Sequence, residues 1–136
     1  MRYTFDIASL TEAQLREIAS LYVTAGWDDE AAAAEEIRRL LEASFLVVCA
    51  IDDSGTVAGT ARAISDGVSD AYVQDVVVNP ACRRRGIGRE MVKRLFAELK
   101  RRGIEWRALV GVPGTESFYR GCGLTAEPDH TLWLDK

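Results

Sequence analysis

The sequence has few of the residues from which metal centres and disulfide frameworks are built. It contains one histidine, His130, and three cysteines, Cys49, Cys82 and Cys122, which lie far apart along the chain. An odd number of widely spaced cysteines fits neither a disulfide framework nor a zinc ribbon. A single histidine with no second ligand nearby supports neither a metal site nor a Ser-His-Asp triad. We therefore expect no metal and reduced thiols, as in a cytoplasmic protein.

Long apolar segments are also missing. No run of about 18 apolar residues is present, so we expect no membrane span. The first residues, MRYTFDIASL, lack the apolar stretch and the cleavage pattern of a signal peptide. Apolar residues nevertheless make up 48% of the 136 residues, which is enough for a packed core. The length predicts one domain that spans residues 1–136.

Charge is unevenly distributed over the chain. The formal net charge is −4, yet the segment from Arg83 to Arg102 holds nine Lys or Arg and two Glu, a local balance of +7. The rest of the chain then carries −11. A protein of this overall charge is not expected to bind nucleic acid, whereas the basic segment can attract an anion. Part of the segment, Arg94 and residues 100–102, also fits an ordinary solvated helix face.

Hydrophobic periodicity and turn residues divide the chain into ten elements. Four helices are predicted, at 11–26, 28–42, 89–100 and 116–123. Thr11 is the expected N-cap of the first helix and Thr115 that of the last. Strands are predicted at 3–7, 44–52, 56–65, 71–80, 105–112 and 131–135. The order β-α-α-β-β-β-α-β-α-β indicates an α+β fold in three layers, with one parallel crossover through helix 89–100.

The stretch VVVNPACRRRGIGREMV joins an apolar strand to a helix through arginines and glycines. A helix N-terminus offers unpaired N–H groups and a partial positive charge, and glycines let an anion approach them. Arginines add forked donors for phosphate oxygens. The segment therefore predicts a diphosphate cradle. Its members are Arg83, Arg84, Arg85, Gly86, Ile87, Gly88 and Arg89.

Two common phosphate loops do not fit this stretch. A nucleoside-triphosphate loop would end in Lys-Ser/Thr, which is absent. A dinucleotide loop would need a third glycine where Met91 stands, and it would follow the first strand of a βαβ unit rather than a meander.

The pattern Arg83-x-x-Gly86-x-Gly88 after Val78-x-Pro80 resembles the acetyl-CoA signature of the GCN5-related N-acetyltransferases. The resemblance extends over nearly the whole chain, from the two N-terminal helices to FYRGCGL, and is greatest to small stand-alone bacterial members. It implies a three-layer α/β/α fold around a mixed, mostly antiparallel sheet. It also implies a single N-acetyltransferase domain that uses acetyl-CoA as acetyl donor.

The resemblance further implies where the cofactor and the chemistry lie. The strand from Tyr72 to Val78 should carry a bulge and diverge from its parallel partner at 106–110. Backbone groups of Val76, Val77 and Val78 would then pair with the pantetheine arm, and one N–H at Val76 or Val77 would stabilise the oxyanion. Tyr119, in the Phe-Tyr pair of the late helix, would protonate the leaving thiolate. The same tyrosine, judged by periodicity alone, fits a packed ring with its hydroxyl in water.

The acceptor side is less clearly marked. Asp75 is the only carboxylate between Ala71 and Val78, so it is the leading general base, although a capping or bulge-holding role fits it too. Tyr22, Trp27 and Arg62 are predicted to bind the acceptor. Trp27 could instead pack on the sheet edge, and Arg62 could point to solvent.

One position departs from the resemblance. Val112 stands where many relatives have an asparagine that bonds to the cofactor arm, which removes one polar contact to the cofactor.

These features favour an enzyme that moves an acetyl group from acetyl-CoA to a small primary amine. A catalytically silent module that binds acyl-CoA shares the same loop and would differ at Tyr119 and in the acceptor cleft. A nucleic-acid binder is disfavoured by the net charge of −4. The resemblance is also compatible with a homodimer. Nothing in the sequence names the amine.

Overall fold

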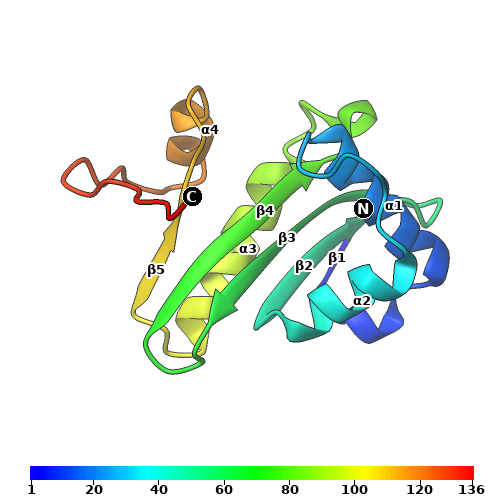
Figure 1. The fold of residues 1–136 in the computed structure, drawn as a ribbon, viewed down its shortest axis with the longest axis horizontal. Helices are drawn as coiled ribbons and strands as arrows, with labels where there is room; N and C mark the ends of the chain where they lie inside the picture. The colour runs from blue at the N-terminus through cyan, green and yellow to red at the C-terminus, as the bar shows by residue number, and fades with distance from the viewer.

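The computed structural model describes residues 1–136 and has one five-stranded sheet flanked by helices (Figure 1). The strands are β1 (Arg2–Thr4), β2 (Leu46–Ile51), β3 (Val57–Ser65), β4 (Asp70–Val78) and β5 (Trp106–Leu109). The helices are α1 (Glu12–Thr24), α2 (Ala34–Ala43), α3 (Ile87–Arg101) and α4 (Glu116–Gly121), with 3-10 turns at Ile7–Ser9 and Pro80–Cys82. None of the helices combines the length and the apolar character needed to cross a membrane.

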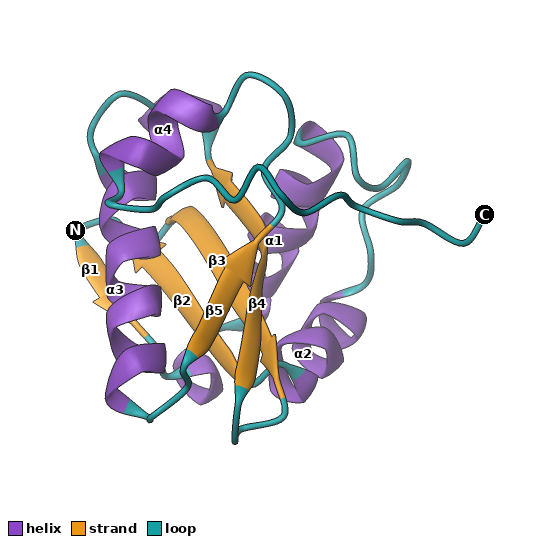
Figure 2. Ribbon diagram, turned by 90° about the vertical axis from the view of Figure 1, so that its left-hand side faces the viewer, coloured by secondary structure: helices purple, strands orange, loops and turns teal.

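The sheet lies between two helical layers, with α1 and α2 on one face and α3 on the other (Figure 2). The strands follow the order β1-β2-β3-β4-β5, and every neighbouring pair is antiparallel except β4 and β5. The predicted α+β fold in three layers, with one parallel crossover, is therefore confirmed.

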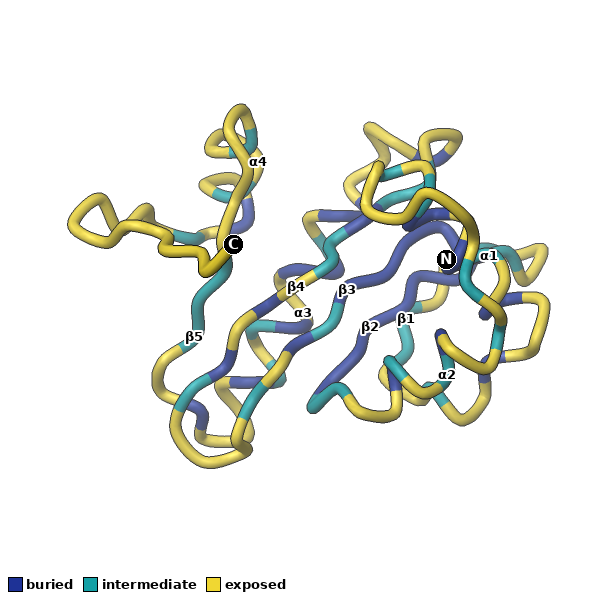
Figure 3. Tube along the Cα trace, viewed as in Figure 1, coloured by how far each residue is buried: buried dark blue, intermediate teal, exposed yellow.

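Alternate residues of the central strands fill the two cores. All of β2 is buried: Val48 and Ala50 pack toward α3, while Val47 and Cys49 pack toward α1 and α2. This continuous burial explains why β2 reads as an unbroken apolar run rather than an alternating one. Burial fades toward β5 and α4, where no residue of either element is buried (Figure 3).

Several boundaries differ from the predictions, among them the end of β5, which lies at Leu109 instead of residue 112. The first strand covers residues 2–4 instead of 3–7, because Asp6 starts a 3-10 turn. The second helix begins at Ala34 instead of residue 28. The N–H groups of Trp27 and Asp28 both donate to the carbonyl of Tyr22, which holds the chain against the end of α1. Helix α3 begins two residues early, at Ile87, because Gly86 already ends the preceding turn.

The predicted last strand at 131–135 is not formed, and this segment is exposed and extended. The alternation of Leu132, Trp133 and Leu134 is typical of a strand, but a strand exists only where another strand accepts its hydrogen bonds. Within this chain nothing pairs with the segment.

Candidate cofactor and acceptor site

A β-bulge bends β4 at its midpoint. Val78 and Val77 pair with Gly59 and Thr60 of β3, but the next pair is Gln74 with Arg62. One residue of β3 thus faces two residues of β4, Asp75 and Val76. Asp75 has a φ of 54°, in the left-handed region that non-glycine residues seldom occupy. The bulge that the family resemblance implies is present.

Beyond the bulge, β4 loses its partner on one edge. The parallel pairing of β4 with β5 runs only from Asp70 to Val73, and β4 continues to Val78. Figure 1 shows the two strands diverging toward α4. The edge of residues 74–78 that faces β5 therefore has no strand partner. An extended ligand with amide groups can pair with such an edge.

Side chains of the same segment anchor it firmly. Val77 is buried in the core beneath α1 and α2, whereas Val76 and Val78 pack toward α3. The three valines thus belong to the packed core while their backbone stays available. Both interpretations of this run, a core strand and a backbone binding site, are compatible with the structure.

The arginine–glycine loop connects this strand to α3. Cys82 and Ile87 are buried at its two ends, and Arg83, Arg84 and Arg85 are exposed between them. None of these three arginines forms an ion pair within the chain; the pairs that arginines make involve other residues. Their guanidinium groups are free to bind an anion.

The two glycines of the loop have separate roles. Gly86 has a φ of 75° and is the N-cap of α3, with no side chain to occupy the first N–H groups. The N–H groups of residues 87–89 therefore lack an intrahelical acceptor. At Gly88, a Cβ would lie 3.1 Å from Val78 Cγ2 and 3.2 Å from Phe118 Cζ, so glycine permits close packing there. This contact brings the start of α3, the end of β4 and α4 together.

Tyr119 follows Phe118 on α4. The two rings meet edge to face with centroids 4.9 Å apart. The Tyr119 ring also packs on Gly111, where a Cβ would lie 3.3 Å from Cε2. Burial, with a smaller contribution from Cys122, raises the pKa of the Tyr119 hydroxyl above its ordinary value of 10.0. The phenol is therefore protonated at neutral pH, as a proton donor must be.

Two sequence expectations around α4 need qualification. Thr115 precedes the helix, but its side chain does not cap it: Thr115 Oγ1 donates to the carbonyl of Val112 at 2.6 Å. Val112, which replaces the asparagine of many relatives, is 66% exposed.

The predicted acceptor residues gather on the face of the sheet that α1 and α2 cover. Arg62 Nε donates to Asp75 Oδ2 at 2.7 Å, and the ring centroids of Tyr22 and Trp27 are 5.4 Å apart. Burial first, and then the charge of Asp75, raises the pKa of Tyr22 well above its ordinary value, while Arg62 acts in the opposite direction. The four residues thus form one cluster, called here the acceptor cluster.

Within this cluster the pairing of Arg62 with Asp75 was missed by sequence reasoning. The two residues stand 13 positions apart on neighbouring strands, but the bulge shifts the register between them. Arg62 is thereby mostly buried, with 14% of its side chain exposed, and it neither points freely to solvent nor lacks a partner. Asp75 keeps 27% exposure, and Oδ1 makes no hydrogen bond within the chain.

We expect the ion pair to hold the bulge in place. Asp75→Asn should lower the free energy of unfolding by about 1–2 kcal/mol, because it leaves a mostly buried guanidinium without its counter-charge. Asparagine tolerates the left-handed backbone, so strain is not added. Urea unfolding of Asp75→Asn, Arg62→Met and the double variant measures the coupling. If the losses in free energy of unfolding of the two single variants add up to that of the double variant, the two residues are not coupled and this expectation is wrong.

Comparison with known proteins places these features in context. The family model described as "Acetyltransferase (GNAT) family" matches residues 12–124. Among solved structures, a putative acetyltransferase from Deinococcus radiodurans superposes with a TM-score of 0.81 at 24% identity, covering 99% of this chain and 87% of that one. That likeness supports the fold.

Sequence relatives add two named proteins. The rice (Oryza sativa subsp. japonica) protein "Serotonin N-acetyltransferase 2, chloroplastic" is 41% identical over 98 residues, which cover 70% of this chain and 49% of the rice protein. "Uncharacterized N-acetyltransferase ycf52-like" from Prochlorococcus marinus is 30% identical over 130 residues, which cover 93% of this chain and 71% of that protein. The chain thus spans about half the length of the rice relative.

Proposed function

The chain belongs to the GNAT acetyltransferase family, and from that premise we propose that it transfers the acetyl group of acetyl-CoA to the primary amine of a small molecule. The single observation that carries the proposal is the unpaired edge of residues 74–78, which runs directly into the free arginines and amides of residues 83–89. An extended amide arm and a diphosphate, joined in one ligand, fit these two features in that order.

Binding orients the thioester for direct attack. The loop arginines and the first amides of α3 hold the diphosphate, and the backbone of Val76–Val78 pairs with the pantetheine arm. One N–H of Val76 or Val77 donates to the thioester oxygen as negative charge develops there. Holding donor and acceptor together removes much of the entropic barrier, on the order of 7–11 kcal/mol for well-aligned reactants.

Two side chains move the protons. The amine nitrogen forms the new C–N bond while the C–S bond breaks, and CoA leaves as a thiolate. Asp75 first accepts a proton from the cationic amine through its free oxygen, Oδ1, which frees the nitrogen lone pair for the attack. Tyr119 protonates the departing sulfur, and the acetylated nitrogen loses its second proton to solvent. Arg62 holds the other oxygen, Oδ2, and so fixes the direction of the carboxylate. Both groups return to their starting protonation state through solvent.

We propose an aromatic amine as the acceptor. Trp27 is 47% exposed beside Tyr22, so the acceptor cluster offers an aromatic surface next to the Asp75 carboxylate. Such a surface suits a flat apolar ring that carries a cationic amine. The printed name of the rice relative, a serotonin N-acetyltransferase, supports the same class.

The proposed function is tested by following thiol release from acetyl-CoA with a panel of aromatic and aliphatic amines and amino sugars. We expect release that depends on the amine, with the highest kcat/KM for an aromatic amine. A folded protein that binds CoA but releases no thiol with any amine would instead be a silent acyl-CoA-binding module. Equal kcat/KM values for all classes of amine would contradict the proposal of an aromatic acceptor but would still support an acetyltransferase.

Trp27 should set the preference for aromatic acceptors. We expect Trp27→Ala to raise KM for an aromatic amine such as tryptamine about 10-fold, since one stacked ring is worth about 0.5–1.5 kcal/mol beyond its buried area. Affinity for acetyl-CoA should hardly change, because Trp27 follows α1 and belongs neither to the loop of residues 83–89 nor to the open edge of residues 74–78. An aliphatic amine is the matched control substrate. A KM that rises equally for both amines would show that Trp27 only supports the fold.

A further inference from the structure

The hydroxyl of Tyr22 is an unpaired polar group inside the acceptor cluster. Tyr22 lies on α1 and is only 5% exposed, and its ring packs in the same core as Val77 of β4. The hydroxyl makes no hydrogen bond within the chain, yet every fully buried side-chain oxygen and nitrogen of the structure has a partner. The small exposed part of Tyr22 therefore includes its hydroxyl, which is free to bind a ligand that reaches it.

A second unpaired oxygen lies in the same cluster. Arg62 Nε donates to Asp75 Oδ2 at 2.7 Å, whereas Oδ1 accepts no hydrogen bond within the chain, and 27% of the Asp75 side chain is exposed. The Tyr22 hydroxyl is near this carboxylate, because the charge of Asp75 is, after burial, the next cause of the raised pKa of Tyr22. No hydrogen bond joins the two residues directly, so both oxygens can accept hydrogen bonds from one bound group.

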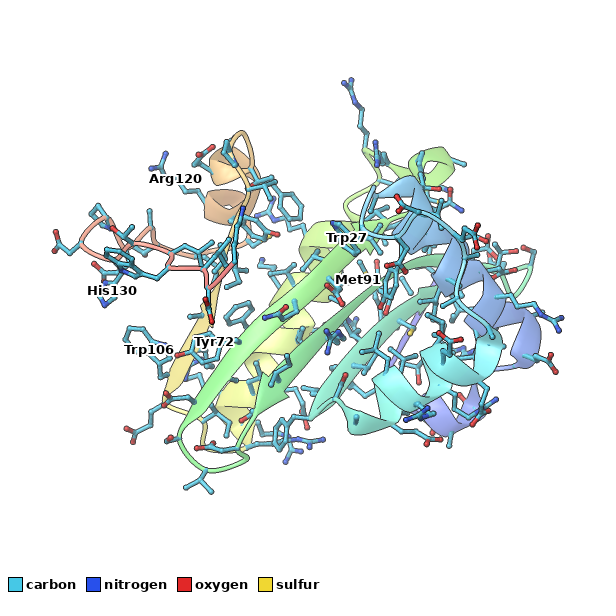
Figure 4. All side chains as sticks on the ribbon, viewed as in Figure 1. Trp27, Tyr72, Met91, Trp106, Arg120 and His130 are labelled. Atoms are coloured by element: carbon cyan, nitrogen blue, oxygen red, sulfur yellow. The ribbon has the colours of Figure 1, made fainter.

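Trp27 adds an aromatic surface beside these two oxygens. Its ring centroid lies 5.4 Å from that of Tyr22, and 47% of Trp27 is exposed. Figure 4 shows Trp27 in front of the C-terminal half of β4, which carries the open edge of residues 74–78, whereas Tyr72 and Trp106 lie toward the other end of the strand. One small molecule can therefore place a ring against Trp27 and a nitrogen at the two oxygens.

We propose that the Tyr22 hydroxyl and Asp75 Oδ1 together bind the amine nitrogen of the acceptor, an inference that rests on the proposed function. A protonated amine only donates hydrogen bonds, so it fits two oxygens that can both accept. One N–H donates to Tyr22 Oη and another to Asp75 Oδ1. After Asp75 has taken one proton, the neutral primary amine keeps two N–H groups, one of which stays on Tyr22. Tyr22 thus holds the nitrogen while it changes from a cation to a nucleophile.

This pair of oxygens, called here the amine site, selects for primary amines. A protonated primary amine has three N–H groups and can serve both oxygens. A protonated N,N-dimethylamine has only one N–H, and the charged carboxylate is the stronger acceptor for it. The Tyr22 hydroxyl should therefore contribute to the binding of a primary amine and not to that of its dimethyl derivative.

Calorimetric titration of amines into the protein saturated with CoA tests the amine site without turnover, because CoA carries no acetyl group. We expect Tyr22→Phe to weaken the binding of phenethylamine about 10-fold or more, the usual effect of losing a hydrogen bond to a charged group. Binding of N,N-dimethylphenethylamine should hardly change. The variant keeps the aromatic ring, so the midpoint of urea unfolding should not fall. Tyr3→Phe, which removes a hydroxyl on β1, is the control variant and should bind both amines like the wild type.

The outcomes separate this inference from the proposed function. Equal affinity of the wild type and Tyr22→Phe for phenethylamine would overturn it, and so would equal losses for the two amines, because the hydroxyl would then receive no N–H group. A CoA-bound wild type that binds neither amine would overturn it as well. A loss confined to phenethylamine, in a protein that releases no thiol from acetyl-CoA, would support the amine site and reject the transferase.

Discussion

Replacing Arg83 and Arg85 by glutamate is expected to weaken CoA binding by about 100-fold or more. Each guanidinium–phosphate hydrogen bond contributes about 1.5–3 kcal/mol, and each factor of ten in affinity corresponds to about 1.4 kcal/mol. The two arginines are exposed and make no ion pair within the chain, so the fold should not suffer. Isothermal titration calorimetry with CoA measures the change in affinity.

A matched variant separates this contact from the effect of overall charge. Arg39→Glu with Lys100→Glu changes the net charge by the same amount at two exposed positions outside the loop, on α2 and at the end of α3. It should reduce CoA affinity only slightly, and the difference should vanish at high salt. If both double variants lose affinity equally, the arginines act only through long-range charge, and the proposed cradle is wrong.

Tyr119→Phe is expected to lower kcat by about 100-fold or more, since a positioned general acid contributes about 10²–10⁴-fold. Affinity for acetyl-CoA should hardly change, because the hydroxyl acts on the departing sulfur rather than on the bound ligand. Burial raises the pKa of this phenol above 10.0, so the hydroxyl stays protonated and loss of its proton should not reduce the wild-type rate near neutral pH.

Tyr3→Phe is the control for this experiment. Tyr3 lies on β1 beneath the Arg94 guanidinium, with 4.7 Å between Arg94 Cζ and the ring centroid, and it has no part in the proposed site. Its kcat should equal that of the wild type. An unchanged kcat in Tyr119→Phe would remove this residue from the mechanism, and an equal loss in both variants would indicate a general effect on the fold.

Local signals made much of this fold predictable. Thr11 and Gln14 form the capping box that their spacing predicts: Thr11 Oγ1 accepts from Gln14 N, and Gln14 Oε1 accepts from Thr11 N. Met91, Leu95 and Leu99, which fall on the apolar stripe that periodicity predicts for this helix, are buried in α3. Such features depend on residues a few positions apart, which the sequence places side by side.

Features that depend on distant partners were harder to predict. Arg62 meets Asp75 only because the bulge in β4 shifts the register, and neither residue alone indicates that pairing. The start of α2 depends on where Ile37 and Leu41 are buried rather than on the helix propensity of the alanines before it. The alternation of Leu132, Trp133 and Leu134 is typical of a strand, but no strand forms there, because a strand also needs a pairing partner that a local pattern does not supply.

The account depends most on one contact, that of the loop backbone with the diphosphate of CoA. Titration of ¹⁵N-labelled protein with CoA, followed by amide chemical shifts, tests it residue by residue. The account predicts saturable shifts that are largest at the amides of residues 86–89 and 76–78. Saturable binding that leaves these amides unmoved, or a folded protein that shows no shifts at all, would contradict it.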